Sequence, residues 1–107
     1  MMKPKKLEET IKEIARVYFI SLHHINEINT MSLSNGNIDS YSPFYKYFQD
    51  VEKTFRLLDV ETQRIINNEY FYNAYAYWWI NDYSTNEFKK KKRLAVKSFL
   101  EVFYEIH

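Results

Sequence analysis

Cationic side chains are concentrated in residues 89–97, which hold six cationic residues and no acid. These are Lys89, Lys90, Lys91, Lys92, Arg93 and Lys97. The rest of the chain holds nine basic and fourteen acidic residues, so the formal net charge of +1 conceals a local positive pole. Because lysine and arginine neutralise phosphate, such a pole indicates a polyanionic partner. The alternative interpretation is a solvated face of a lysine-rich protein.

If this segment is helical, its polar residues form one continuous row. Four of them follow one another at spacings of four, three and four, and we call them the basic ridge: Asn86, Lys90, Arg93 and Lys97. The basic ridge lies opposite Phe88 and Phe99 on a helical projection. Such a helix can lie along a DNA groove, with its cations on phosphates and the short polar residues of its first turn at base edges. This face is therefore the candidate nucleic-acid interface.

Residues suited to catalysis or metal binding are sparse. His23 and His24 are adjacent, so in a helix they point roughly 100° apart and cannot share a metal as ligands four residues apart would. The chain has no cysteine and one glycine, and it contains no phosphate-binding glycine loop, nucleophile elbow or HExxH motif. We therefore predict a protein that is not an enzyme and has no catalytic residues, no metal site and no cofactor.

A block of aromatic residues precedes the basic segment. Its members are Tyr70, Phe71, Tyr72, Tyr75, Tyr77, Trp78 and Trp79. Exposed rings of this kind could stack on single-stranded bases. The pattern favours a helical core instead, because the block is apolar on nearly every side of a helix.

The elements that must position these residues are predicted to be helices. Aromatic residues make up 19% of the chain, which supplies a core, and only two prolines and one glycine are present, which disfavours the many tight turns of a β-fold. Residues 1–28 contain a long N-terminal helix starting at Pro4, with one apolar stripe: Leu7, Ile11, Ile14, Tyr18, Leu22 and Ile25. Phe19 and Ile20 lie off that stripe, which predicts contact with a protein partner or a second copy of the chain.

The remaining elements follow from turn and cap signals. Residues 29–41 read as a loop, and Ser42 with Pro43 starts a second helix. Asp59 caps a short helix from Val60 to about residues 67–68, and the aromatic block gives a helix over about 73–81. The best-marked helix runs from Thr85 to about Glu105, behind the capping box of Ser84 and Glu87. We predict one all-α domain over 1–107, with about five helices and a helical core over 42–107.

The order of the last elements is typical of a helix-turn-helix over residues 60–104. A short helix and a second apolar helix lead to a tight turn at 81–83 and then to the capped basic helix. Residues 57–100 resemble region four of bacterial sigma factors, and more closely the small phage-type transcription regulators of Gram-positive bacteria that share this module. The matching positions are Leu57-Leu58, Ile65-Ile66, Tyr70-Phe71, Tyr83-Ser84, Lys91-Lys92-Arg93, Leu94-Ala95 and Phe99-Leu100.

The resemblance implies which residues contact DNA. Carried over by position, they are Thr85, Asn86, Lys89, Lys90 and Arg93, and the helical projection adds Lys97. The chain departs from the family at 74–79, where aromatic residues replace small residues and an acid. Glu87 also places an acid near the expected DNA end, which is compatible with binding if Glu87 folds back to cap the helix.

Two functions follow from these patterns. The first is a DNA-binding, transcription-associated protein with duplex DNA as its partner. The second is a helical interaction module that binds itself or another protein through the N-terminal helix, its basic helix being merely solvated. No signal peptide and no membrane-spanning stretch is indicated, so we expect a cytoplasmic protein without membrane contact.

Overall fold

The computed structural model describes residues 4–31, 43–72 and 74–107, and within those ranges it contains helices and no β-strand. The helices are α1 (Pro4–Met31), α2 (Pro43–Leu57), α3 (Val60–Ile66), the π-helix η2 (Asn67–Phe71) and α4 (Thr85–Ile106). The predicted all-α class is confirmed, and four α-helices lie close to the predicted number of about five. None of the described helices is both long enough and apolar enough to span a membrane.

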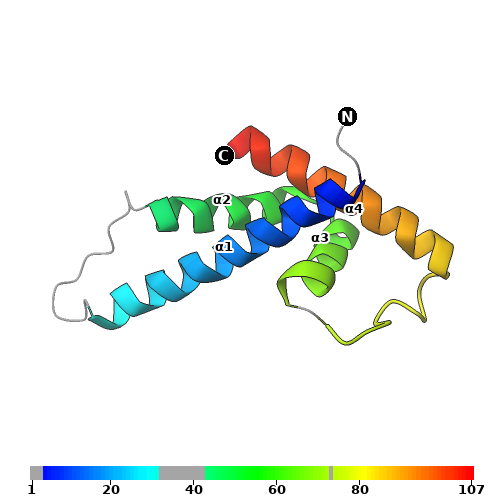
Figure 1. The fold of residues 1–107 in the computed structure, drawn as a ribbon, viewed down its shortest axis with the longest axis horizontal. Coiled ribbons are helices and arrows are strands. Elements are labelled where there is room, and N and C mark those ends of the chain that lie inside the picture. Colours follow the sequence, from blue (N-terminus) through cyan, green and yellow to red (C-terminus); the bar gives the residue numbers. More distant parts are fainter. Residues whose placement is uncertain (1–3, 32–42, 73) are drawn as a thin grey trace.

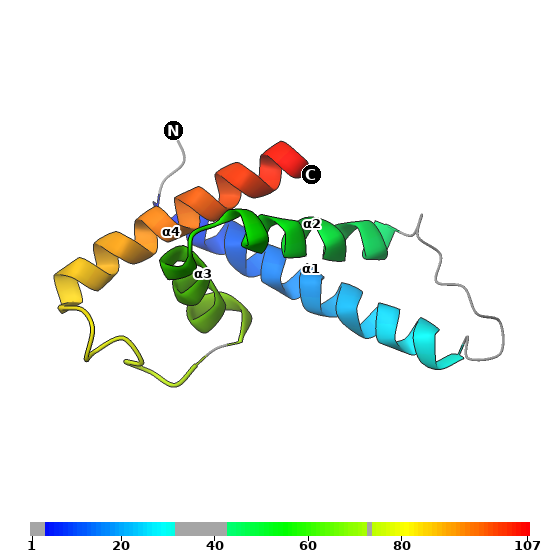
Figure 2. The same cartoon turned by 180° about the vertical axis from the view of Figure 1, so that it is seen from behind.

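The helices form an elongated body of 53 × 31 × 22 Å. In Figure 1, α1 and α2 run side by side in opposite directions, and α4 crosses them near the start of α1. α3 follows α2 and packs against α4, and η2 continues from α3 and packs against α1. The first turns of α4 project beyond the other helices in both Figure 1 and Figure 2. The N-terminal half of α4 is therefore presented at one end of the molecule.

The core is centred on Phe99 of α4, which is completely buried. Its ring lies 5.4 Å from that of Phe55 and 5.8 Å from that of Phe71, so α2, η2 and α4 meet at one aromatic contact. Ile11 of α1 and Val51 of α2 are fully buried in the same core. Burial of this apolar surface is the main force that holds the helices together.

One buried carboxylate at the edge of the core was not expected from the sequence. Asp50 accepts a hydrogen bond from Lys46 Nζ at 2.8 Å, and its carboxylate lies 2.8 Å from Nδ1 of His107. Burial alone would raise the pKa of Asp50, but the hydrogen bonds from Lys46 and His107 outweigh it and the pKa lies below its usual value. Asp50 thereby ties α2 to the end of α4.

Two of the predicted N-terminal caps, Asp59 and Ser84, are present. Asp59 accepts a hydrogen bond from the backbone amide of Thr62 at 2.7 Å at the start of α3. At the start of α4, the Ser84 hydroxyl accepts from the Glu87 amide at 3.2 Å, and the Glu87 carboxylate accepts from the Ser84 amide at 3.4 Å. This is the reciprocal capping box that the sequence predicts, and it fixes the first residue of α4.

Removal of the cap should be measurable. Ser84→Ala should lower the free energy of unfolding by about 1 kcal/mol, because the Glu87 amide loses its acceptor. Urea denaturation followed by circular dichroism measures this change. Ser98→Ala is the matched control: Ser98 lies in the middle of α4, where alanine is the better helix former, so stability should not fall. Equal stability of Ser84→Ala and wild type would contradict the capping role.

Two predicted helix ends need correction. α1 continues to Met31, so residues 29–31, predicted as the start of a loop, are helical; residues 32–41 of that loop, and the capping Ser42, lie outside the described residues. The helix at 60 does not stop near residues 67–68 but widens into η2, where the Tyr72 amide donates to the Asn67 carbonyl five residues earlier at 2.8 Å. The wider turn buries both Tyr70 and Phe71.

The helix predicted over about 73–81 is wrong for the described part of that range, residues 74–81. Residues 74–75 have no regular structure and residues 76–81 form turns, with hydrogen bonds such as that from the Ile80 amide to the Tyr77 carbonyl at 3.0 Å. Tyr77 has a φ of 61°, which no right-handed helix accommodates. The physical reason is tertiary: Trp78 and Trp79 both pack on Phe88, and aromatic residues have only weak helix propensity to oppose this.

Candidate nucleic-acid interface

The basic ridge lies on the solvent side of α4. Asn86, Lys90, Arg93 and Lys97 are all exposed, as is Lys89 beside them. The opposite face of the helix is buried through Phe88, Ala95 and Phe99. Within the described residues, the cations of the basic ridge and Lys89 form no ion pair with any acid. Their charges are thus presented to solvent in one row.

The two lysines between Lys90 and Arg93 behave differently. Lys91 Nζ lies 3.1 Å from the carboxylate of Glu61 on α3. Lys92 Nζ lies 3.5 Å from Glu8 of α1 and 3.3 Å from Glu69 of η2. These two charges are paired with acids of the same chain and tie α4 to its neighbours, Lys91 at the surface and Lys92 at a partly buried position. The basic segment therefore divides into a structural pair and an outward-facing set.

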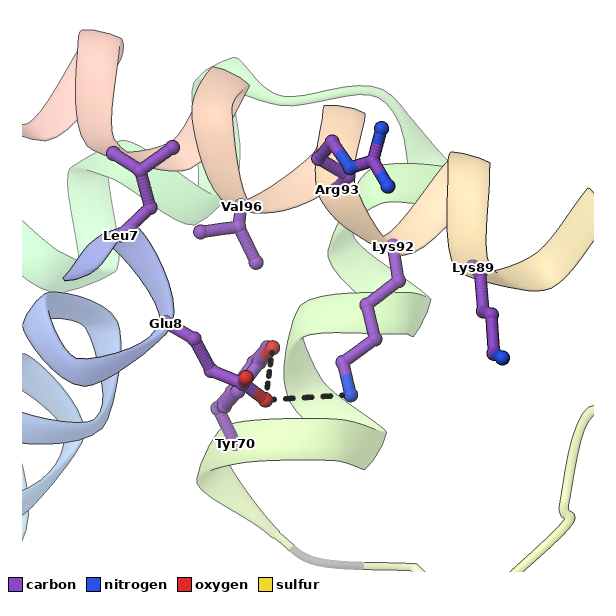
Figure 3. A pocket seen from close by; sticks show the side chains of 7 residues that line it. All are labelled: Leu7, Glu8, Tyr70, Lys89, Lys92, Arg93 and Val96. Atoms are coloured by element: carbon purple, nitrogen blue, oxygen red, sulfur yellow. Dashed lines mark hydrogen bonds and ion pairs between the residues drawn. The ribbon is translucent and has the colours of Figure 1, made fainter. Parts of the chain in front are cut away.

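A pocket of about 350 Å³ lies beside the basic ridge. Figure 3 shows its lining, which α1, η2 and α4 supply: Leu7, Glu8, Tyr70, Lys89, Lys92, Arg93 and Val96. In that view Lys92 turns toward Glu8, and Tyr70 donates its hydroxyl to Glu8 at 3.2 Å. Burial first, and then the negative charge of Glu8, raise the pKa of Tyr70, so its hydroxyl remains a proton donor. Lys89 and Arg93 remain available at the pocket for an anionic group.

The first turn of α4 carries the remaining candidate contacts. Thr85 and Asn86 are exposed at the end that projects from the body. Glu87, whose acidity could repel phosphate, is folded back on Ser84 in the capping box. Backbone amides at a helix N-terminus favour anions, which adds to the charge of the lysines. All six residues predicted to contact nucleic acid are therefore exposed on one helix.

The connection into α4 differs from the tight helix-turn-helix that the sequence predicts. Because residues 74–81 are not helical, the last helical residue before α4 is Phe71 of η2, and residues 74–84 bridge the interval as turns and extended chain. An ion pair and a hydrogen bond hold this bridge in place: Arg64 of α3 lies 3.0 Å from Asp82, and the Tyr83 hydroxyl donates to the Glu61 carboxylate at 2.8 Å. α3 still packs against α4, but through a longer connection.

The histidine pair of α1 is engaged in local contacts. His23 Nε2 lies 3.0 Å from the Glu27 carboxylate one turn later, and the ring of His24 lies 4.4 Å from that of Phe44 on α2. Over the ranges that the structure covers, no group of three or more histidine, cysteine, aspartate or glutamate residues could hold a metal ion.

The sequence contained a usable signal for the paired lysines that was missed. Lys91 and Lys92 follow Phe88 by three and four residues, so on a helix they lie on the same side as Phe88 and not on the basic ridge. The exposure of Tyr72, Tyr75 and Tyr77 had no such signal, because it depends on the turns before α4.

A scan against protein-family models, a search of curated proteins and a search of solved structures each found no match to this chain.

Proposed function

We propose that this protein binds duplex DNA through the basic ridge of α4 and takes part in transcription. The observation that carries the proposal is the division of charge along α4. Lys91 and Lys92 are consumed by internal ion pairs, whereas Lys90, Arg93 and Lys97 are exposed and have no acidic partner among the described residues. Three unpaired cations in one row on the surface can each neutralise a phosphate, whereas cations that stabilise a folded core are paired with acids of the same chain.

The position of α4 supports the same proposal. Its first turns project past the other helices, so a duplex can approach Thr85 and Asn86 without meeting α1 or α2 (Figures 1 and 2). α3 packs against α4 and would support it as the first helix of a helix-turn-helix supports the second. The resemblance to sigma region four adds transcription as the process, in the cytoplasm, where a bacterial protein meets DNA.

Titration of a random-sequence duplex tests the binding claim. Fluorescence anisotropy should show binding at about 50 mM salt and a steep loss of affinity toward about 200 mM. Lys91→Ala should change the affinity little, because that charge is already paired with Glu61. Absence of duplex binding at the lower salt concentration would overturn the proposal.

Selection from a random duplex pool then tests sequence recognition, and enrichment of one motif would support a role in transcription regulation.

A second function is favoured by a separate apolar patch. Phe19 and Ile20 on α1 are 36% and 44% exposed, and the Phe19 ring lies 5.8 Å from that of the exposed Tyr72. Contiguous exposed apolar side chains mark protein contacts more often than isolated ones do. As the alternative to DNA binding, we propose that the protein is an interaction module that self-associates through Phe19, Ile20 and Tyr72.

Analytical ultracentrifugation tests this alternative. Wild type should form dimers as its concentration rises, and Phe19→Ser with Ile20→Ser should shift the equilibrium to monomer, because the apolar contact is lost. Tyr104→Ser is the matched control, since Tyr104 is 58% exposed on α4 and lies outside the patch. The dimer should be insensitive to salt, unlike DNA binding. A wild type that remains monomeric at every concentration would contradict self-association.

A further inference from the structure

The segment that joins η2 to α4, the basic helix, exposes three tyrosine rings. Tyr72, Tyr75 and Tyr77 are 62%, 79% and 65% exposed, although tyrosine has a large apolar ring that folding usually covers. Tyr75 and Tyr77 lie in the segment between η2 and α4, with Tyr77 in a turn. Rings displayed to this extent are available to stack on another flat surface.

The Tyr77 ring is held in place by a contact with a neighbouring ring. The Tyr77 ring lies 5.9 Å from that of Trp79, and the Trp79 ring stacks on Phe88 at 4.4 Å with an angle of 5° between their planes. Trp78 on the other side is buried, with Nε1 3.5 Å from Glu69 and the Arg64 guanidinium 5.0 Å from its ring. An aromatic series thus runs from the surface at Tyr77 to the core face of α4.

The backbone at Tyr77 adds an independent observation. Its φ of 61° is in the left-handed region, which a bulky residue with a Cβ atom avoids. The conformation persists because Trp78 and Trp79, which follow it, are both anchored. Backbone strain of this kind concentrates at functional sites, and here it turns the Tyr77 ring outward while both tryptophans pack inward.

The charges nearby identify the partner of the rings. Lys89 directly follows Phe88, on which the aromatic series ends, and Figure 3 shows its side chain extending from α4 toward the side on which the turns pass. Aromatic rings for stacking together with positive charge for the backbone are the combination that binds single-stranded nucleic acid. A paired base inside a duplex has both faces covered by its neighbours, so only an unpaired base can use Tyr75 or Tyr77.

We propose that Tyr75 and Tyr77 stack on the unpaired bases of a DNA single strand that passes Lys89 as it leaves a duplex whose phosphates lie on the basic ridge. This inference rests on the proposed function and narrows it to DNA in which a duplex meets a single strand. The rings recognise the flat face of a base without reading its sequence.

Three DNA probes of one design test the inference by fluorescence anisotropy at a fixed low salt concentration. They are a blunt duplex, the same duplex with a single-stranded thymidine overhang, and the same duplex with an abasic overhang that has equal phosphate charge. The thymidine overhang should bind at least about fivefold more tightly than the abasic one, the lower end of what one stacked base contributes. Tyr75→Ala with Tyr77→Ala should abolish that preference and leave blunt-duplex affinity unchanged.

Two control variants separate the rings from general effects. Tyr75→Phe with Tyr77→Phe retains the ring faces and should keep the preference. Tyr104→Ala removes a tyrosine of similar exposure elsewhere on α4 and should keep it as well. Equal affinity of wild type for the thymidine and abasic overhangs, with blunt-duplex binding intact, would overturn this inference and leave the proposed function standing. Absence of binding to all three probes would overturn both.

Discussion

Replacement of Lys90, Arg93 and Lys97 together by alanine should weaken duplex binding by about two orders of magnitude at roughly 0.1 M salt. Each cation that neutralises a phosphate releases about 0.9 counterion, so the variant should also lose about 2–3 from the log-log salt slope. The three side chains are exposed on the face of α4 opposite Phe99 and have no ion-pair partner in the described residues. The melting temperature should therefore stay close to that of wild type.

A matched variant makes this result specific to the basic ridge. Lys12→Ala, Lys53→Ala and Arg56→Ala remove the same net charge from exposed positions on α1 and α2. If the basic ridge is the interface, this control should keep most of its affinity. Equal losses in both triple variants would mean that overall charge, and not the face of α4, attracts DNA. Unfolding of the ridge variant would instead assign those residues a structural role.

Phe99→Ala should have the largest effect on stability, lowering the free energy of unfolding by about 3–5 kcal/mol. Phe99 is fully buried, and its ring contacts come from three elements through Phe55, Phe71 and Phe103, so no single helix can relax into the cavity. Because small domains are stable by about 5–15 kcal/mol, a large part of the total would be lost.

Urea denaturation of Phe99→Ala beside Tyr104→Ala measures this effect. Tyr104 is on the same helix but 58% exposed, so its replacement should change the free energy of unfolding by about 0.5 kcal/mol or less. A lower midpoint with an unchanged slope is the expected result for Phe99→Ala. A loss below about 1 kcal/mol would mean that the core is not centred on this residue.

Local signals were sufficient for most of the fold. The capping box of Ser84 and Glu87 fixed the start of α4, and Asp59 fixed that of α3, because a cap is determined by residues within one turn. The apolar stripe of α1 was also read correctly, with Ile11, Ile14 and Tyr18 buried. These features need no knowledge of which helix packs against which.

The errors occurred where tertiary contacts outweigh local pattern. Uniform hydrophobicity over 74–81 could not distinguish a buried helix from turns in which Trp78 is buried while Tyr75 is exposed. The same holds for the charges of α4: which lysines are free depends on Glu61, Glu8 and Glu69, all of them far from α4 in the sequence. The exposed positions of the candidate interface could be predicted, but its electrostatic division could not.

The salt dependence of wild-type duplex binding tests the central claim most directly. Lys89, Lys90, Arg93 and Lys97 are exposed and unpaired within the described ranges, so up to four phosphates can be neutralised by α4. A plot of log affinity against log salt concentration should be linear with a slope of about −3 to −4. A slope near zero, or no binding at about 50 mM salt, would contradict DNA binding by this helix.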